Sequence, residues 1–170
     1  GTHTFLLYIN DITESITSDI RIFADDCILY RCISSIGDCI ALQHDIDTLL
    51  AWSNTWKMHF NPSKCQVMSV TRQRKRFPFV YRLGEVVLPC VASFTYLGVV
   101  ISSDLRWNLH TDMVTAKATR TLNLIRRNLY RCPQNIKSLA YTTLVRPLLE
   151  YASAAWDPHT GHNVKDIEMV

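Results

Sequence analysis

The sequence predicts an α+β fold in two parts, a region that mixes strands with one long helix and a region that is almost entirely helical. Three observations support this prediction. Residues 19–24 alternate between apolar and polar side chains and residues 27–32 form a second β-rich run, residues 38–56 repeat apolar side chains at helical spacing, and helical spacing returns after about residue 103. We therefore expect one part over residues 1–103 and a second over residues 104–170.

The first part begins with a short apolar stretch and a predicted hairpin. Apolar side chains concentrated between Phe5 and Ile12 favour a short buried helix. The two β-rich segments that follow are separated only by Asp25 and Asp26. Two strands joined by two polar residues are typical of a β-hairpin, so we expect both aspartates in its turn.

A long amphipathic helix is predicted next, with Ser34 or Ser35 and Asp38 available to cap its start. Its apolar positions are Ile40, Leu42, Ile46, Leu49, Leu50 and Trp56. The pattern stops at Asn61 and Pro62. Beyond it, β-branched and aromatic residues predict short strands of an antiparallel meander at 65–70, 77–81, 86–88 and 94–101.

The second part is predicted to contain two helices. The first helix carries an apolar stripe on one face and four cations on the opposite face. At a rotation of ~100° per residue, the four cations lie within about 80° of one another around the helix axis. The stripe is Val114, Ala118, Leu122, Ile125 and Leu129, and the cations are Lys117, Arg120, Arg127 and Arg131. The second helix is expected to begin near Pro133 and to bend at Pro147. The polar segment 158–170 carries no functional signal.

Composition excludes several classes of protein. With 170 residues, 48% apolar and 19% charged, the chain is not a disordered or collagen-like sequence. Its five glycines are too scattered for a dinucleotide-binding turn or a P-loop. No apolar run approaches the ~20 residues of a membrane span. Because the sequence opens with Gly1 and carries no signal peptide, we expect a segment of a longer protein inside the cell, in the nucleus or cytoplasm.

The six cysteines never occur as C-x-x-C, and we expect reduced thiols rather than a zinc site. The four tryptophans fall on or beside apolar stripes and are expected to pack rather than to stack on bases. No histidine has neighbours that suggest a ligand set or a nucleophile. We therefore assign the histidines no role.

The net charge of +3 is distributed unevenly. Residues 1–103 hold nine basic and nine acidic side chains, whereas residues 104–170 hold nine basic and six acidic ones. A second basic cluster is formed by Arg72, Arg74, Lys75 and Arg76. Contact with nucleic-acid phosphates and ordinary solvated surface both explain these cations.

Asp25 and Asp26 are the clearest chemical feature of the sequence. Two adjacent carboxylates at a hairpin tip repel each other, so a divalent cation such as Mg²⁺ is a natural partner. Aspartate is also a favoured turn residue, and simple turn chemistry remains the alternative.

The surrounding residues resemble reverse transcriptases, specifically those of non-LTR (LINE-type, jockey-like) retrotransposons. Residues 7–11 and 22–30 resemble the stretch into and through the third catalytic motif, which contains Phe23-Ala24-Asp25-Asp26. Trp52, Trp56 and residues 61–65 resemble motif D, and residues 94–98 resemble motif E, the primer grip. Residues 120–131 and 144–156 resemble the thumb and the segment after it.

The resemblance implies part of a polymerase palm over 1–103, an antiparallel sheet with the catalytic hairpin and packed helices, and an α-helical thumb over 104–170. It implies transfer of a nucleotide from a dNTP to a DNA primer 3′-OH on an RNA template, with two Mg²⁺ ions. Asp25 would be the principal metal ligand, with Asp26 beside it. Lys64 would neutralise or protonate the departing pyrophosphate, and Tyr96, Leu97 and Gly98 would hold the primer.

The family supplies a further metal-binding carboxylate from an earlier motif A, which these 170 residues do not contain. We therefore expect this chain alone not to polymerise DNA. The alternative is a catalytically dead remnant of a decayed element that at most binds nucleic acid weakly. The sequence gives no indication of a membrane partner or of an oligomeric state.

Overall fold

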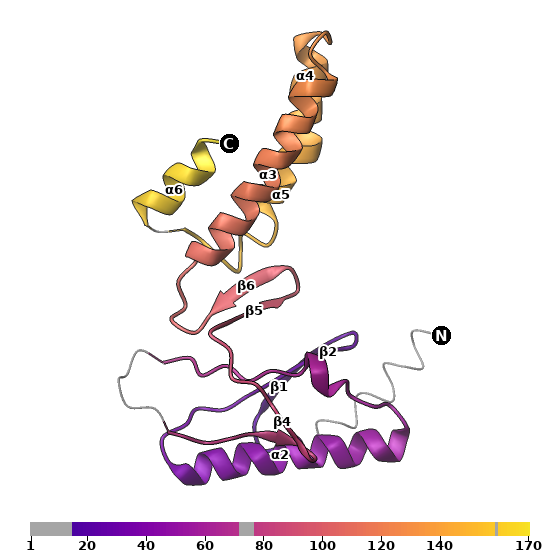
Figure 1. Cartoon of the computed structure of the whole chain (residues 1–170), viewed down its shortest axis with the longest axis vertical. Helices are drawn as coiled ribbons and strands as arrows, with labels where there is room; N and C mark the ends of the chain where they lie inside the picture. The colour runs from indigo at the N-terminus through magenta and orange to yellow at the C-terminus, as the bar shows by residue number, and fades with distance from the viewer. Residues whose placement is uncertain (1–14, 72–76, 159) are drawn as a thin grey trace. The chain divides into compact units, whose positions relative to one another are not determined.

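The computed structural model describes residues 15–71, 77–158 and 160–170 (Figure 1). The helix expected at residues 5–12 and the cluster Arg72, Arg74, Lys75 and Arg76 lie outside the described residues. Two compact units are formed, one by residues 15–67 and 77–90 and the other by residues 68–71 and from 91 onward. Both strands and helices are present, which confirms the mixed α+β class.

The first unit contains the predicted hairpin, made of β1 (Asp19–Phe23) and antiparallel β2 (Asp26–Tyr30). The expected turn is wrong by one residue. Phe23 pairs with Asp26, so the two loop residues are Ala24 and Asp25, and Asp26 is the first residue of β2. Ala24 makes this possible by adopting a left-handed φ of 52°.

Helix α2 (Ile36–Trp56) matches the predicted helix, and Ser35 caps it in a reciprocal capping box with Asp38. Its buried face differs from the expected apolar stripe, because Ile40 is 57% exposed while Asp45 and Ser53 are fully buried. Hydrophobic periodicity assigns polar side chains to the surface, whereas these two are buried with hydrogen-bond partners.

The meander is not formed. After the short helix η2 (Pro62–Lys64), the described residues contain only the two-residue strands β3 (Arg82–Leu83) and β4 (Val86–Val87) before residue 91. The expected strand 65–70 is reduced to an isolated parallel bridge between Val67 and Cys90, in which the Val67 amide donates to the Pro89 carbonyl at 2.9 Å.

The expected strand 77–81 is also absent from the described residues, since only Arg82 and Leu83 pair with β4. Gln43 fixes this hairpin to α2, because its side-chain amide donates to the Arg82 carbonyl and accepts from the Arg82 amide, each at 2.9 Å.

The second unit begins with a hairpin of β5 (Ser93–Tyr96) and β6 (Val99–Ser102), where a single strand over 94–101 was expected. The chain reverses because Leu97 and Gly98 both have positive φ, 46° and 80°. Helix α3 (Asn108–Asn128) starts later than predicted. The side chains of Ser102 and Asp104 bind the Arg106 backbone in a local turn that delays it.

Helix α4 (Gln134–Ala140) runs through a π-helical turn, η3 (Tyr141–Val145), into α5 (Arg146–Glu150). The disturbance expected at Pro147 thus takes the form of a wider turn, in which the Arg146 amide donates to the Tyr141 carbonyl. Helix α6 (Gly161–Glu168) was not predicted. It is fixed by a 2.9 Å hydrogen bond between Asn163 and Asn108, at the start of α3.

Two apolar clusters hold the second unit together. One contains Val99, Val114 and Trp156, and the other contains Ala118, Ile125 and Val145, all buried. The apolar stripe predicted on α3 is therefore confirmed, and Trp156 packs as expected. No helix within the described residues has the length and hydrophobicity that a membrane crossing requires.

Candidate active site and nucleic-acid surface

Asp25 and Asp26 lie at the exposed tip of the β1–β2 hairpin. Asp26 shares a face of the hairpin with its partner Phe23, whose side chain is 61% exposed. Within the described part of the chain, neither carboxylate takes part in an ion pair or accepts a hydrogen bond. Both therefore present free oxygen ligands at one point of the surface.

Asp45 of α2 anchors the start of this hairpin. Its buried carboxylate accepts hydrogen bonds from the Thr17 amide at 3.0 Å, the Thr17 hydroxyl at 3.0 Å and the Ser18 amide at 2.8 Å. Burial raises the pKa of the Asp45 carboxyl, but the hydrogen bonds from Ser18 and Thr17 together outweigh it and hold the pKa below its ordinary value.

Arg31 anchors the other end, directly after β2. Its guanidinium donates to the hydroxyls of Thr17 and Ser18, at 3.1 and 3.3 Å, and lies 3.9 Å from the Asp38 carboxylate. Both ends of the hairpin are thus fixed to one helix, and the tip is the part left free to meet a ligand.

Carboxylate oxygens suit a hard divalent cation, and Mg²⁺ is commonly held by one or two carboxylates together with water and substrate phosphates. Asp25 and Asp26 fit that donor set. The described residues contain no group of three or more histidine, cysteine, aspartate or glutamate side chains that could enclose an ion. This chain therefore offers part of a coordination sphere.

Lys64 is exposed at the last position of η2. The next residue, Cys65, donates from its thiol to the Asn61 carbonyl at 3.3 Å. Burial, with a smaller contribution from the nearby Cys65, raises the pKa of the Cys27 thiol to about 11. Cys65 follows Lys64 and Cys27 follows Asp26, so the two segments lie within electrostatic range of each other.

The Leu97–Gly98 turn is held by Tyr151, the residue after α5. The Tyr151 hydroxyl donates to the Leu97 carbonyl at 3.0 Å, and a Cβ on Gly98 would meet the Tyr151 ring at 3.0 Å. Tyr151 is itself held, because its carbonyl accepts from the indole of buried Trp156 at 2.8 Å. The residue types alone did not indicate this arrangement.

His110 has a structural role that the sequence analysis missed. It is fully buried, and its ring lies edge-on to the Trp156 ring with 4.4 Å between the ring centroids. Its Nδ1 accepts a hydrogen bond from the Val100 amide at 3.2 Å. Burial lowers its pKa, so the neutral imidazole is the form that packs beside the β5–β6 hairpin.

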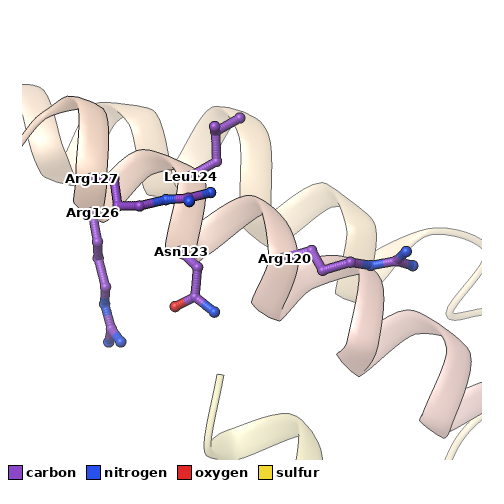
Figure 2. Close-up of a pocket in the computed structure, with 5 residues that line it drawn as sticks. All are labelled: Arg120, Asn123, Leu124, Arg126 and Arg127. Atoms are coloured by element: carbon purple, nitrogen blue, oxygen red, sulfur yellow. The ribbon is translucent and has the colours of Figure 1, made fainter.

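A basic surface lies on α3. The predicted cations Lys117, Arg120 and Arg127 are exposed on this helix, whereas Arg131, also exposed, lies beyond its last residue, Asn128, so the predicted helical face does not extend to it. Two of them line an open depression of about 670 Å³, together with Asn123, Leu124 and Arg126. In Figure 2, Arg120 and Arg127 extend in the same direction along the helix, whereas Asn123 and Arg126 extend to another side. Arg126 and Asn123 were missed because they lie off the predicted stripe.

Replacing Ala24 with glycine should stabilise the hairpin. Alanine at a φ of 52° costs about 1 kcal/mol, which glycine avoids, so the free energy of unfolding should rise by roughly 0.5–1 kcal/mol in urea denaturation. Ala51→Gly, in the exposed interior of α2, is the matched control and should lower it by about 1 kcal/mol. A loss of stability in both variants would contradict the argument.

The comparisons with known proteins bear on this geometry. A family model described as reverse transcriptase (RNA-dependent DNA polymerase) matches residues 1–101, which is more than half of the chain. The match includes the β1–β2 hairpin, η2 and most of the β5–β6 hairpin. No curated protein and no solved structure matches. The hairpin that carries Asp25 and Asp26 thus belongs to a chain of the reverse transcriptase family, the RNA-dependent DNA polymerases.

Proposed function

We propose that this chain serves an RNA-directed DNA polymerase of a non-LTR retrotransposon, which joins nucleotides to a primer 3′-OH by two-metal chemistry. The observation that carries the proposal is the pair of free carboxylates, Asp25 and Asp26, at the tip of a hairpin anchored at both ends to α2. The non-LTR assignment rests on the residues quoted above around this hairpin, in motifs D and E and in the helical part.

The roles of the tip residues follow from their positions. Asp25 and Asp26 would hold Mg²⁺, which would supply positive charge to offset that of the reacting phosphates. Asp25, in the loop itself, is the principal ligand, and Asp26 at the start of β2 completes or tunes the site. Phe23 and Ala24 form the adjoining surface, and the left-handed Ala24 is the kind of backbone strain that is common at functional sites.

We assign Lys64 to the departing pyrophosphate, where a cation would neutralise the charge or deliver a proton. Its exposure leaves its ammonium group accessible, and the electrostatic influence of Cys65 on Cys27 is consistent with a place near the hairpin. Ordinary solvation of an exposed lysine is the alternative role.

The Tyr96–Leu97–Gly98 turn is proposed to hold the primer strand. Among the described residues the Gly98 amide has no hydrogen-bond acceptor, so it is available to a phosphate oxygen. Leu97, like Ala24, is a non-glycine residue at positive φ. The cations of α3 are proposed to contact phosphates of the template and primer, a role we also retain for the cluster Arg72, Arg74, Lys75 and Arg76.

Phosphate contact can be tested through its salt dependence. The double variant Arg120→Gln, Arg127→Gln should bind an RNA–DNA hybrid more weakly than wild type. The slope of its log affinity against log salt concentration should be smaller in magnitude by about 2. Fluorescence anisotropy measures both. Arg146→Gln, which removes a guanidinium already paired with Glu150 at 2.7 Å, is the control and should leave the slope nearly unchanged. Equal slopes in wild type and double variant would contradict the proposed contacts.

A non-catalytic remnant that only binds nucleic acid remains the second candidate, and the incomplete set of metal ligands in the described residues favours it for this chain by itself. Primer extension with the 170-residue chain would exclude the remnant if nucleotides were incorporated. We expect no incorporation. Mg²⁺-dependent incorporation that disappears in Asp25→Ala would show that these residues suffice for catalysis.

A further inference from the structure

We infer that Tyr151 is a positioning residue for the Leu97–Gly98 turn, and that its hydroxyl holds the central peptide of that turn in its observed orientation. The inference rests on the proposed role of this turn in holding the primer. Tyr151 follows the last helical residue of α5 and is 54 residues away from Leu97 in the sequence.

The turn between Leu97 and Gly98 is not favoured by both of its residues. With positive φ at both residues, 46° and 80°, the turn has the character of a type I′ turn. Glycine suits the second position, but Leu97 at the first is a non-glycine residue at positive φ and is strained there. A contact from outside the hairpin can therefore stabilise this conformation.

Tyr151 supplies that contact. Its hydroxyl donates to the Leu97 carbonyl at 3.0 Å. Because the C=O and N–H of a trans peptide point in opposite directions, the Gly98 amide then faces away from Tyr151. Loss of this hydrogen bond would leave the strained turn free to move, and its amide would no longer be held in a fixed direction.

The position of Tyr151 is itself well determined. The indole of Trp156, which is 3% exposed, donates to the Tyr151 carbonyl, and Trp156 packs in the same cluster as Val99 of β6. The tyrosine ring lies close enough to Gly98 that an added Cβ would sit 3.0 Å from it. The turn is thus fixed from both sides by one buried cluster.

Tyr151→Phe removes the hydroxyl and keeps the ring, and Tyr130→Phe is the matched control, since Tyr130 is 77% exposed and its hydroxyl has no hydrogen bond within the described residues. Each full-length variant is titrated with an RNA–DNA hybrid that has a recessed primer 3′ end. A second hybrid set carries a neutral methylphosphonate at each of the last few primer phosphates in turn.

We expect wild type and Tyr130→Phe to lose about fivefold in affinity when the contacted phosphate is neutralised, the size of one hydrogen bond. Tyr151→Phe should bind the unmodified hybrid about fivefold more weakly than wild type. Its affinity should then change little when the contacted phosphate is neutralised. In the free protein, amide exchange over residues 96–99 should be faster in Tyr151→Phe alone.

The inference would be overturned if Tyr151→Phe lost as much affinity as wild type when the contacted phosphate is neutralised, or if its amides exchanged at the wild-type rate. Either result would leave the primer contact intact. A wild-type chain that is insensitive to neutralisation at every position would overturn the primer role of the turn, and the inference with it.

Discussion

Replacing Asp45 with alanine is expected to lower the free energy of unfolding by about 3 kcal/mol or more. The change removes a fully buried acceptor and leaves the Thr17 and Ser18 amides without their partner, at roughly 1–3 kcal/mol for each unsatisfied group. The start of β1 is then no longer fixed to α2. Chemical denaturation measures the total effect, and amide exchange at the base of the hairpin measures its location.

Asp47→Ala is the matched control for this variant. Asp47 lies on the same helix but is exposed, and its carboxylate accepts only from the Gln43 side chain at 2.9 Å. The expected cost is about 0.5 kcal/mol or less. Equal losses in Asp45→Ala and Asp47→Ala would contradict the proposed anchor.

The same carboxylate makes the hairpin anchor sensitive to acid. The folded-state pKa of Asp45 is lowered, so its stabilising contribution is fully present above the unfolded pKa of about 3.9 and is lost as the pH falls through the folded value. The difference in stability between wild type and Asp45→Ala should therefore be constant above about pH 5 and shrink in more acidic solution. Asp38, Asp104 and His110 titrate in both proteins, so their contributions cancel.

The second large effect is expected at the hairpin tip. Asp25→Asn should weaken Mn²⁺ binding at least tenfold, because it removes the charged ligand in the loop, and Asp26→Asn should weaken binding less. Electron paramagnetic resonance of free Mn²⁺ measures both. Asp19→Asn, on the same exposed face at the other end of β1, is the control and should bind as wild type does. A loss of binding shared equally by all three variants would indicate diffuse electrostatic attraction.

The elements that the sequence predicted well are those with long, strong periodicity. The apolar stripe of α3 repeats over many residues, and packing preserves it. The extent of α2 was also predicted, although its buried face was not. The short strands near residues 65–81 were predicted wrongly because β-propensity measures the fit to a pleated surface, and the described residues offer these segments almost no partner strand. Helix α6 escaped notice because only a few of its side chains, such as Ile167, are covered.

The residues of the candidate site also fall into two groups, those that the sequence identified and those that it did not. The tip carboxylates, Lys64 and the turn at Gly98 are local motifs, and the sequence identifies them as candidates. Asp45 and Tyr151 are not local, because their partners Thr17 and Leu97 are 28 and 54 residues away. A buried aspartate also violates the usual expectation for a charged side chain, so periodicity placed it at the surface.

The central claim is that the tip of the β1–β2 hairpin binds the divalent cation of a nucleotidyl-transfer site. The most direct test is a map of paramagnetic broadening by Mn²⁺ in the amide spectrum of the isotopically labelled chain. The account predicts broadening centred on residues 24–27 that is removed by Mg²⁺ in excess and is absent in the double variant Asp25→Asn, Asp26→Asn. Broadening centred elsewhere, or unchanged in the double variant, would contradict it.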